Sequence, residues 1–298
     1  MTEPTDATPA APRTEASPPE RSALALAAGD ALLRVHGPQL LQAAVLALLL
    51  PAGSKRARRA WQFETAMSGS AAAMRVHVLH LPASARLPWL ETLVRRLGGQ
   101  PLEVRKDLLA ATRRVMGARG TIRPIDRLHW LAMRQWLGEG SAAQQREAAA
   151  EDLSRLPQGE VSAIASYSAF LSRLVPIDAS EGAAETAVSS EGDAPATAGE
   201  RWYEEVMAPW RPHADVPACR PPDTDGLVHA LHDLQAMAWM QRPMLVRRWV
   251  SAAQQHAADA GPGTLDATAA DALRLSCTLL DSPLPPALAQ HFGTPPAP

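Results

Sequence analysis

The stretch LPWLETLVRRLGGQPLEVRKDLLAATRRVMG, residues 87–117, decides the fold class. Its leucines and valines recur every three or four residues, which places them on one face of a helix. Gly98 and Gly99 interrupt this pattern and favour a helix end, and Pro101 favours the first turn of a second helix. The stretch therefore predicts two helices joined by a tight turn.

The same helical periodicity continues on both sides of this stretch. The segment 76–80, VHVLH, fits a strand or a helix equally well, and no other run predicts a strand. Apolar stripes predict helices near residues 24–35, 40–49, 124–137, 142–156, 160–174, 226–241, 243–260 and 266–280. We therefore predict an all-α protein, built as a multi-helix array.

Composition divides the chain into segments. The first residues are rich in Pro, Thr, Ala and Glu, and residues 178–199 contain almost no large apolar side chains, which is typical of a flexible linker. We predict a disordered tail at 1–21, a first helical unit at 22–176, a linker at 177–225 with a short helix near 202–207, a second helical unit at 226–292 and a tail at 293–298.

Charge is distributed unevenly along the chain, although the formal net charge is only −2. Residues 54–134 contain 16 Lys and Arg against 5 Asp and Glu, whereas residues 176–234 contain 3 against 12. A basic segment of this kind is either a solvated face or a contact surface. As a contact surface it would bind a protein or an anionic membrane. A nucleic acid is less favoured as partner, because the sequence has no DNA-binding motif. Its candidate contact residues are Arg56, Arg58, Arg59, Arg113 and Arg114.

A second candidate surface combines methionine and tryptophan at helical spacing in the C-terminal third. Such residues form either an adaptable binding groove or ordinary core between two helices. The candidate partner-binding residues are Met237, Met240, Met244 and Trp249, with Trp239 beside them.

Catalytic motifs are absent from the sequence. No His-Glu-x-x-His, Walker A, Gly-x-Gly-x-x-Gly or Gly-x-Ser-x-Gly pattern occurs, so we expect a non-enzymatic protein without a cofactor. Cys219 and Cys277 fit neither a disulfide framework nor a zinc motif, and they favour a reducing compartment. Two His-x-x-His pairs are weak metal candidates: His77 with His80, and His229 with His232 and Asp233.

The sequence predicts no membrane span. The N-terminus lacks the basic start and apolar stretch of a signal peptide. The most apolar run, residues 39–50, has twelve residues, whereas a span needs about 20, so we expect a buried core helix there. We predict a cytoplasmic protein, with association at a membrane surface as the alternative.

Two regions carry a resemblance to a known family. Residues 87–137, with GTIRPID at 120–126, and residues 263–286, with GTLD at the start and LDSPLPP at the end, resemble the C-terminal helical region of bacterial membrane-bound His-Glu-x-x-His zinc metallopeptidases. The resemblance implies two TerB-like helical units without the protease domain, for which the residues before 39 leave no room. Each family unit has an Asp before the Gly of its turn and an acidic residue in the next helix.

The chain departs from this pattern at the acidic positions. Arg119 and Pro262 stand where the family has Asp, and Ala269 replaces the second helix carboxylate, whereas Asp126 keeps the first. A metal role implied by the resemblance is therefore not expected here.

These observations lead to a ranked set of functions. We predict a non-catalytic helical interaction or regulatory module with a protein partner, for which the resemblance names a membrane protease as one candidate. The alternative is a peripheral binder of lipid headgroups or nucleic acid through the Arg-rich segment 54–134. A third hypothesis is a metal-dependent enzyme that uses His229, His232 and Asp233. The sequence leaves the oligomeric state open.

Overall fold

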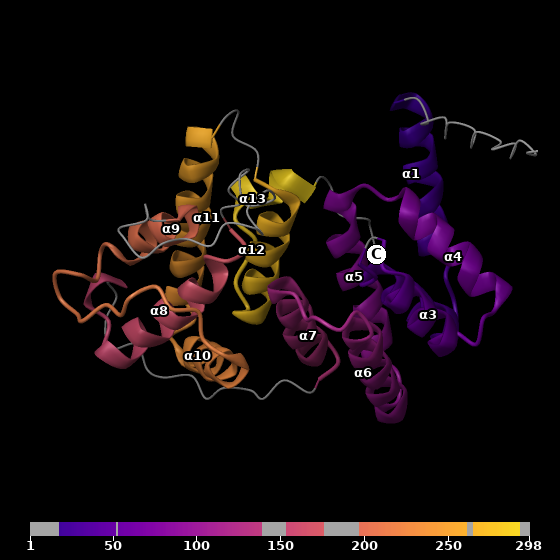
Figure 1. The fold of residues 1–298 in the computed structure, drawn as a ribbon, viewed down its shortest axis with the longest axis horizontal. Coiled ribbons are helices and arrows are strands. Elements are labelled where there is room, and N and C mark those ends of the chain that lie inside the picture. The colour runs from indigo at the N-terminus through magenta and orange to yellow at the C-terminus, as the bar shows by residue number, and fades with distance from the viewer. Residues whose placement is uncertain (1–17, 52, 139–152, 176–196, 261–264, 293–298) are drawn as a thin grey trace, which may run out of the picture.

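The computed structural model describes residues 18–51, 53–138, 153–175, 197–260 and 265–292. Over these residues the protein is all-α, as predicted, with thirteen α-helices, one 3-10 helix at Leu153–Arg155 and no strand (Figure 1). The α-helices are α1 (Pro18–Leu33), α2 (Pro38–Leu48), α3 (Lys55–Glu64), α4 (Gly69–His80), α5 (Ala83–Gly98), α6 (Leu102–Gly117), α7 (Pro124–Trp136), α8 (Gln158–Leu171), α9 (Ala198–Met207), α10 (Thr224–Ala236), α11 (Gln241–Ala260), α12 (Ala267–Leu279) and α13 (Pro286–Phe292).

Local signals in the sequence explain where several helices begin. The Ser54 side chain accepts a hydrogen bond from the Ala57 amide at the start of α3, and Asp266 accepts one from Thr268 at the start of α12. Pro124 is the first residue of α7, where its missing N–H costs nothing. Gly120 has a φ of 93°, so it supplies the left-handed turn between α6 and α7.

Helix α2 is the centre of the N-terminal half of the fold. It contacts α3, α4, α5 and α6, and α1 packs on α4. Its residues from Ala43 to Leu48 are buried, which confirms the core helix expected from residues 39–50. The Trp61 indole of α3 donates a 3.0 Å hydrogen bond to the Ala43 carbonyl, so α3 is also fixed on α2.

The C-terminal half is built around α8, α11 and α12. Tyr167 of α8 stacks on Trp249 of α11 with ring centroids 5.3 Å apart, and its hydroxyl lies 3.0 Å from that of Ser276 in α12. Trp249 also donates a hydrogen bond of 2.9 Å to the Ser168 hydroxyl. Three helices are thus joined through one buried group of polar and aromatic side chains.

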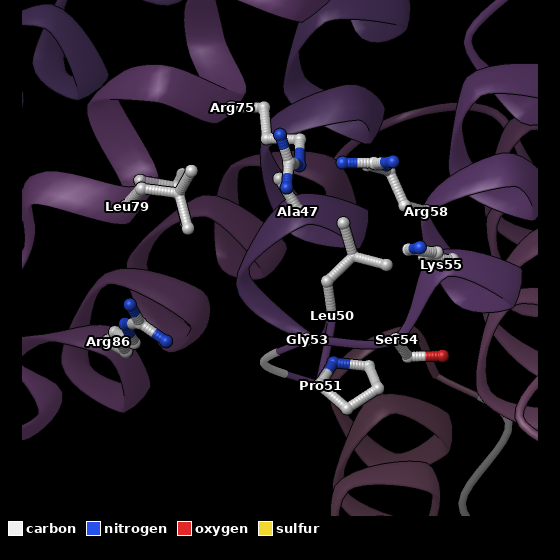
Figure 2. A pocket seen from close by; sticks show the side chains of 11 residues that line it. Ala47, Leu50, Pro51, Gly53, Ser54, Lys55, Arg58, Arg75, Leu79 and Arg86 are labelled. Atoms are coloured by element: carbon white, nitrogen blue, oxygen red, sulfur yellow. The ribbon is translucent and has the colours of Figure 1, made fainter. Parts of the chain in front are cut away.

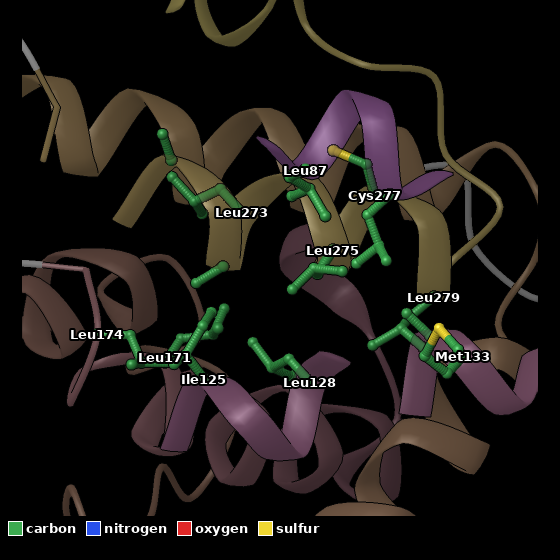
Figure 3. Close-up of a cluster of buried hydrophobic side chains, with 14 of the residues drawn as sticks. Leu87, Ile125, Leu128, Met133, Leu171, Leu174, Leu273, Leu275, Cys277 and Leu279 are labelled. Atoms are coloured by element: carbon green, nitrogen blue, oxygen red, sulfur yellow. The ribbon is translucent and has the colours of Figure 1, made fainter. Parts of the chain in front are cut away.

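The two halves share one buried core. Figure 3 shows leucines from α5, α7, α8 and α12 facing one another, among them Leu87, Leu128, Leu171 and Leu275. Helix α7 packs on α12, and α8 packs on α10 and α9. Because α7 and α8 were assigned to the first helical unit, the contacts of the described residues cross the boundary predicted between the units.

The short helix predicted near 202–207 is present as α9, but the residues around it are not a linker. Residues of α9 and the turn after it are fully buried, because they pack against α8 and α11; they include Trp202, Tyr203, Val206, Met207 and Trp210. Residues 197–225 are therefore part of the folded body. The acidic stretch 176–196 lies outside the described residues, as do the tail 293–298, residues 1–17 and most of the helix predicted at 142–156.

Two smaller expectations are also corrected, and one open alternative is resolved. Helix α1 begins at Pro18, inside the predicted tail, because Pro is accepted in the first turn of a helix. Helix α10 ends at Ala236 rather than at 241, because Met237 leaves the helical conformation with a φ of −60° and a ψ of 154°. The ambiguous segment 76–80 is helical and forms the end of α4.

None of the helices in the described ranges combines the length and apolar character that crossing a membrane requires.

Candidate functional site

A small basic pocket lies where α2 ends and α3 begins, beside the end of α4 and the start of α5 (Figure 2). Its volume is about 120 Å³. Four cationic side chains line it: Lys55 and Arg58 of α3, Arg75 of α4 and Arg86 of α5. Apolar side chains complete the wall, and no acidic residue is found among the described residues that line it; the apolar set is Ala47, Leu50, Pro51, Val78 and Leu79.

Local features of the chain shape the side of the pocket at α3, and helix packing adds the side at α4. Gly53, with a φ of 77°, turns the chain after α2, and the Ser54 cap starts α3 there. Lys55 and Arg58 are three residues apart on α3, and Arg75 and Leu79 are four apart on α4, so each pair shares a helix face. Buried apolar residues of α4 hold that helix on α2.

The electrostatics of the pocket favour a negatively charged occupant. Four like charges face a common space, and the start of α3 adds the partial positive charge of a helix N-terminus. Arg75 and Arg86 each have a buried Nε without a hydrogen-bond partner in the structure. An unmatched buried donor costs about 1–3 kcal/mol, so an acceptor that reaches it is favoured.

One carboxylate outside the pocket wall, that of Asp271, interacts electrostatically with one of the four cations, Arg86. Asp271 of α12 is affected by the charge of Arg86, which slightly lowers the pKa of the Asp271 carboxyl. Burial is the largest influence on this carboxyl and raises its pKa to about 7, with Arg274 opposing the rise.

The structure separates the five predicted arginines. Arg58 lies in the basic pocket, whereas Arg56 and Arg59 are exposed on α3 outside it. Arg113 lines a different groove, between α6, α7 and α10. Arg114 binds Glu64 through two hydrogen bonds of 2.6 and 2.8 Å, which lowers the pKa of Glu64.

Two residues of the pocket were missed by the sequence analysis. Arg75 is the one arginine of α4, and Arg86 lies near the start of α5, nine residues before Arg95, so both are separated from the basic block at residues 55–59. No local pattern marks either residue, because both come to the pocket only through the packing of α4 and α5 on α2.

The methionine and tryptophan candidates are partly corrected. Met237 and Trp249 are fully buried, so neither can contact a partner. The Trp249 ring stacks on Tyr167, and its indole N–H donates a hydrogen bond to the Ser168 hydroxyl. Met240 and Met244 remain exposed near the start of α11, together with Trp239.

The histidine candidates lie at the surface. His229 and His232 are exposed on α10, and His229 Nε2 is 3.5 Å from the Asp233 carboxylate. His77 is half-buried and His80 exposed on α4. Over the part of the chain that the structure describes, no three His, Cys, Asp or Glu side chains are grouped so that they could hold a metal ion.

The turn that carries the family resemblance has a structural role. Asp126 accepts hydrogen bonds from the Arg123 amide and guanidinium at 2.7–3.1 Å, which caps the start of α7.

Comparison with known proteins finds no relative: no protein-family model, no curated protein and no solved structure matches this chain. The likeness to TerB-like metallopeptidase regions therefore stays a prediction.

Proposed function

We propose that this chain is a helical binding module whose basic pocket recognises one phosphate-type anionic group on a larger molecule. The observation that carries the proposal is the convergence of four cationic side chains from three helices on one small cavity with no acidic residue in its described wall. The predicted interaction module is kept here in a narrower form, with the partner defined by its anionic group.

The size of the cavity favours a single group over a whole ligand. Sites for drug-sized molecules occupy about 300–1,000 Å³, and a water molecule takes up about 30 Å³ of the liquid. A cavity of about 120 Å³ thus has room for a tetrahedral oxyanion and a few further atoms. The remainder of the partner would lie outside, on the surface around the pocket.

The residue types in the pocket also favour phosphate or sulfate. Each guanidinium presents several N–H donors in a plane, which matches the oxygens of a tetrahedral oxyanion. Lys55 adds a mobile point charge at the start of α3, where anions are favoured. A membrane protease as partner, nucleic-acid binding and the lack of catalytic activity stay predictions that follow from the sequence alone.

Titration with inorganic phosphate tests the proposal. We expect phosphate to raise the thermal unfolding temperature of the full chain in a saturable way, beyond the effect of sodium chloride at equal ionic strength. Arg58→Gln and Arg75→Gln should each weaken binding about tenfold, since a charge-assisted hydrogen bond contributes about 1.5–3 kcal/mol. Arg247→Gln, an exposed arginine on α11, is the matched control and should bind like the unmodified chain.

Two outcomes of the phosphate titration would contradict the proposal. If the double variant Arg58→Gln/Arg75→Gln responds to phosphate as the unmodified chain does, the pocket is not the binding site. If phosphate acts no more strongly than chloride of equal ionic strength on any of these proteins, the proposal is wrong.

A further inference from the structure

We infer that the anionic group is the phosphate of a phospholipid, and that α3 and α4 face an anionic membrane surface. This inference rests on the proposed phosphate pocket, and it adds the class of molecule that carries the phosphate. It uses a second observation, which is the apolar surface beside the pocket.

Large apolar side chains are exposed on α3, on α4 and in the turn between them, and these two helices supply three of the four cations of the basic pocket. Leu79, which lines the pocket, is 53% exposed, and Val76, one helical turn earlier on α4, is 50% exposed. Phe63 near the end of α3 and Met67 in the turn to α4 are 82% and 77% exposed, the highest values among the large apolar side chains of the described residues. Single exposed apolar residues are common, but here four occur within residues 63–79.

The backbone of the turn between α3 and α4 is held in an unfavourable conformation. Ala66 and Met67 have φ values of 49° and 52°, a region that side chains other than glycine rarely adopt. Such strain persists where the surrounding structure or a function requires it. Here the strained turn carries the highly exposed Met67 side chain.

The same two helices are strongly basic. Together they contain Lys55, Arg56, Arg58, Arg59 and Arg75, and their one acidic residue, Glu64, is already paired with Arg114. Exposed apolar side chains beside Lys and Arg are typical of helices that lie in the headgroup region of anionic membranes. Charge complementarity and apolar exposure thus point to the same partner.

Other carriers of phosphate fit these observations less well. Binding of single-stranded nucleic acid commonly uses aromatic side chains for base stacking, and no aromatic residue is found in the described wall of the pocket. A phosphopeptide or a sugar needs hydrogen-bonding groups around the phosphate, whereas the exposed apolar side chains of α4 at the pocket, Val76 and Leu79, are aliphatic. The small cavity further favours a bare phosphate monoester headgroup, as in phosphatidic acid, over a phosphate covered by choline.

Co-sedimentation with vesicles tests the inference. The probes are vesicles of phosphatidylcholine alone and vesicles that also contain phosphatidic acid or phosphatidylserine. We expect the full chain to bind phosphatidic acid vesicles most tightly and phosphatidylcholine vesicles least. Arg75→Gln should weaken binding to phosphatidic acid vesicles about tenfold. Val76→Ser, at an exposed apolar position of α4 outside the pocket wall, should also weaken it about tenfold while leaving the affinity for inorganic phosphate unchanged.

Matched variants distinguish vesicle binding through α3 and α4 from non-specific adsorption and from misfolding. Met244→Ser removes an exposed apolar side chain on α11, and Arg247→Gln removes an exposed charge there, so both should bind vesicles like the unmodified chain. Phe63→Ser repeats the apolar test on α3, where the side chain is almost wholly exposed and the change should not unfold the protein.

The outcomes distinguish the two proposals. Binding of inorganic phosphate without vesicle binding would overturn the lipid inference, leave the phosphate pocket standing and make a soluble carrier such as a phosphopeptide the partner. Vesicle binding that is equal for both anionic lipids and unchanged by Arg75→Gln would overturn headgroup recognition by the pocket. Failure to bind phosphate or any vesicle would overturn both.

Discussion

The ion pair between Glu91 and Arg274 joins two helices that are far apart in the sequence. Arg274 of α12 donates from Nε and Nη2 to the two carboxylate oxygens of Glu91 in α5, at 2.9 and 2.7 Å. The Glu91 side chain is 5% exposed and that of Arg274 12%. The Arg274 guanidinium also lies 4.6 Å from the centre of the Phe292 ring. We predict that this pair contributes measurably to the stability of the whole fold.

Its expected magnitude follows from the geometry. Removing one partner of a buried pair costs about 3–5 kcal/mol, because the other charge stays buried without compensation. Glu91→Gln keeps one acceptor oxygen, so it should lower the free energy of unfolding by about 2–3 kcal/mol, and Glu91→Ala by the full amount. Arg95 lies 3.7 Å from Glu91 but its side chain is largely exposed, so it compensates for little of the loss.

Urea unfolding followed by circular dichroism measures this effect. Glu91→Gln, Arg274→Met and the double variant form a cycle whose coupling free energy should be about 2 kcal/mol. Glu103→Gln, which breaks an exposed 3.5 Å pair with Lys106, is the matched control and should change stability by less than about 0.5 kcal/mol. A loss for Glu91→Gln no larger than that of the control, or a coupling near zero, would refute the reasoning.

Two further predictions concern a buried carboxyl and a close helix contact. Because burial raises the pKa of Asp271 from 3.8 to about 7 against the opposing charge of Arg274, its ionisation destabilises the fold as pH rises through that range. Asp271→Asn should therefore match the unmodified chain near pH 4 and be more stable near pH 8, by at most about 4 kcal/mol in denaturant unfolding. A side chain at Gly199 of α9 would collide with the Ser172 carbonyl oxygen, whereas one at Gly159 of α8 meets nothing within 4 Å. Gly199→Ala should thus lower stability by about 1–3 kcal/mol and Gly159→Ala raise it by about 0.5 kcal/mol, and equal thermal unfolding of the two variants would contradict this.

The helices themselves could be predicted from the sequence because their signals are local. The apolar spacing around residues 87–97 predicted α5, and Gly98 is its last residue. Pro124 and Asp266 marked the starts of α7 and α12. Each of these signals acts within one or two helical turns, so it is readable without knowing what the helix packs against.

The partners of each helix were decided only by tertiary structure. Residues 197–225 look like a linker by composition, yet Trp202 and Trp210 are buried because α9 packs on α8 and α11. Met237 and Met240 belong to one apolar stripe, but the chain leaves the helical conformation at Met237, so one is buried and the other exposed. Whether an apolar residue is buried depends on the helices that pack against it, and the spacing of apolar residues in the sequence does not identify those helices.

The same distinction applies to the candidate site. Of the three arginines predicted in the basic block, Arg58 lines the pocket, whereas Arg56 and Arg59 lie outside it although they are close in sequence. Arg75 and Arg86 are isolated in sequence and gain a shared pocket only because α4 and α5 both pack on α2. The sequence by itself thus determined that the protein is helical and that its first half is basic. Only the tertiary structure decided which of those charges face one cavity, since their convergence comes from long-range packing.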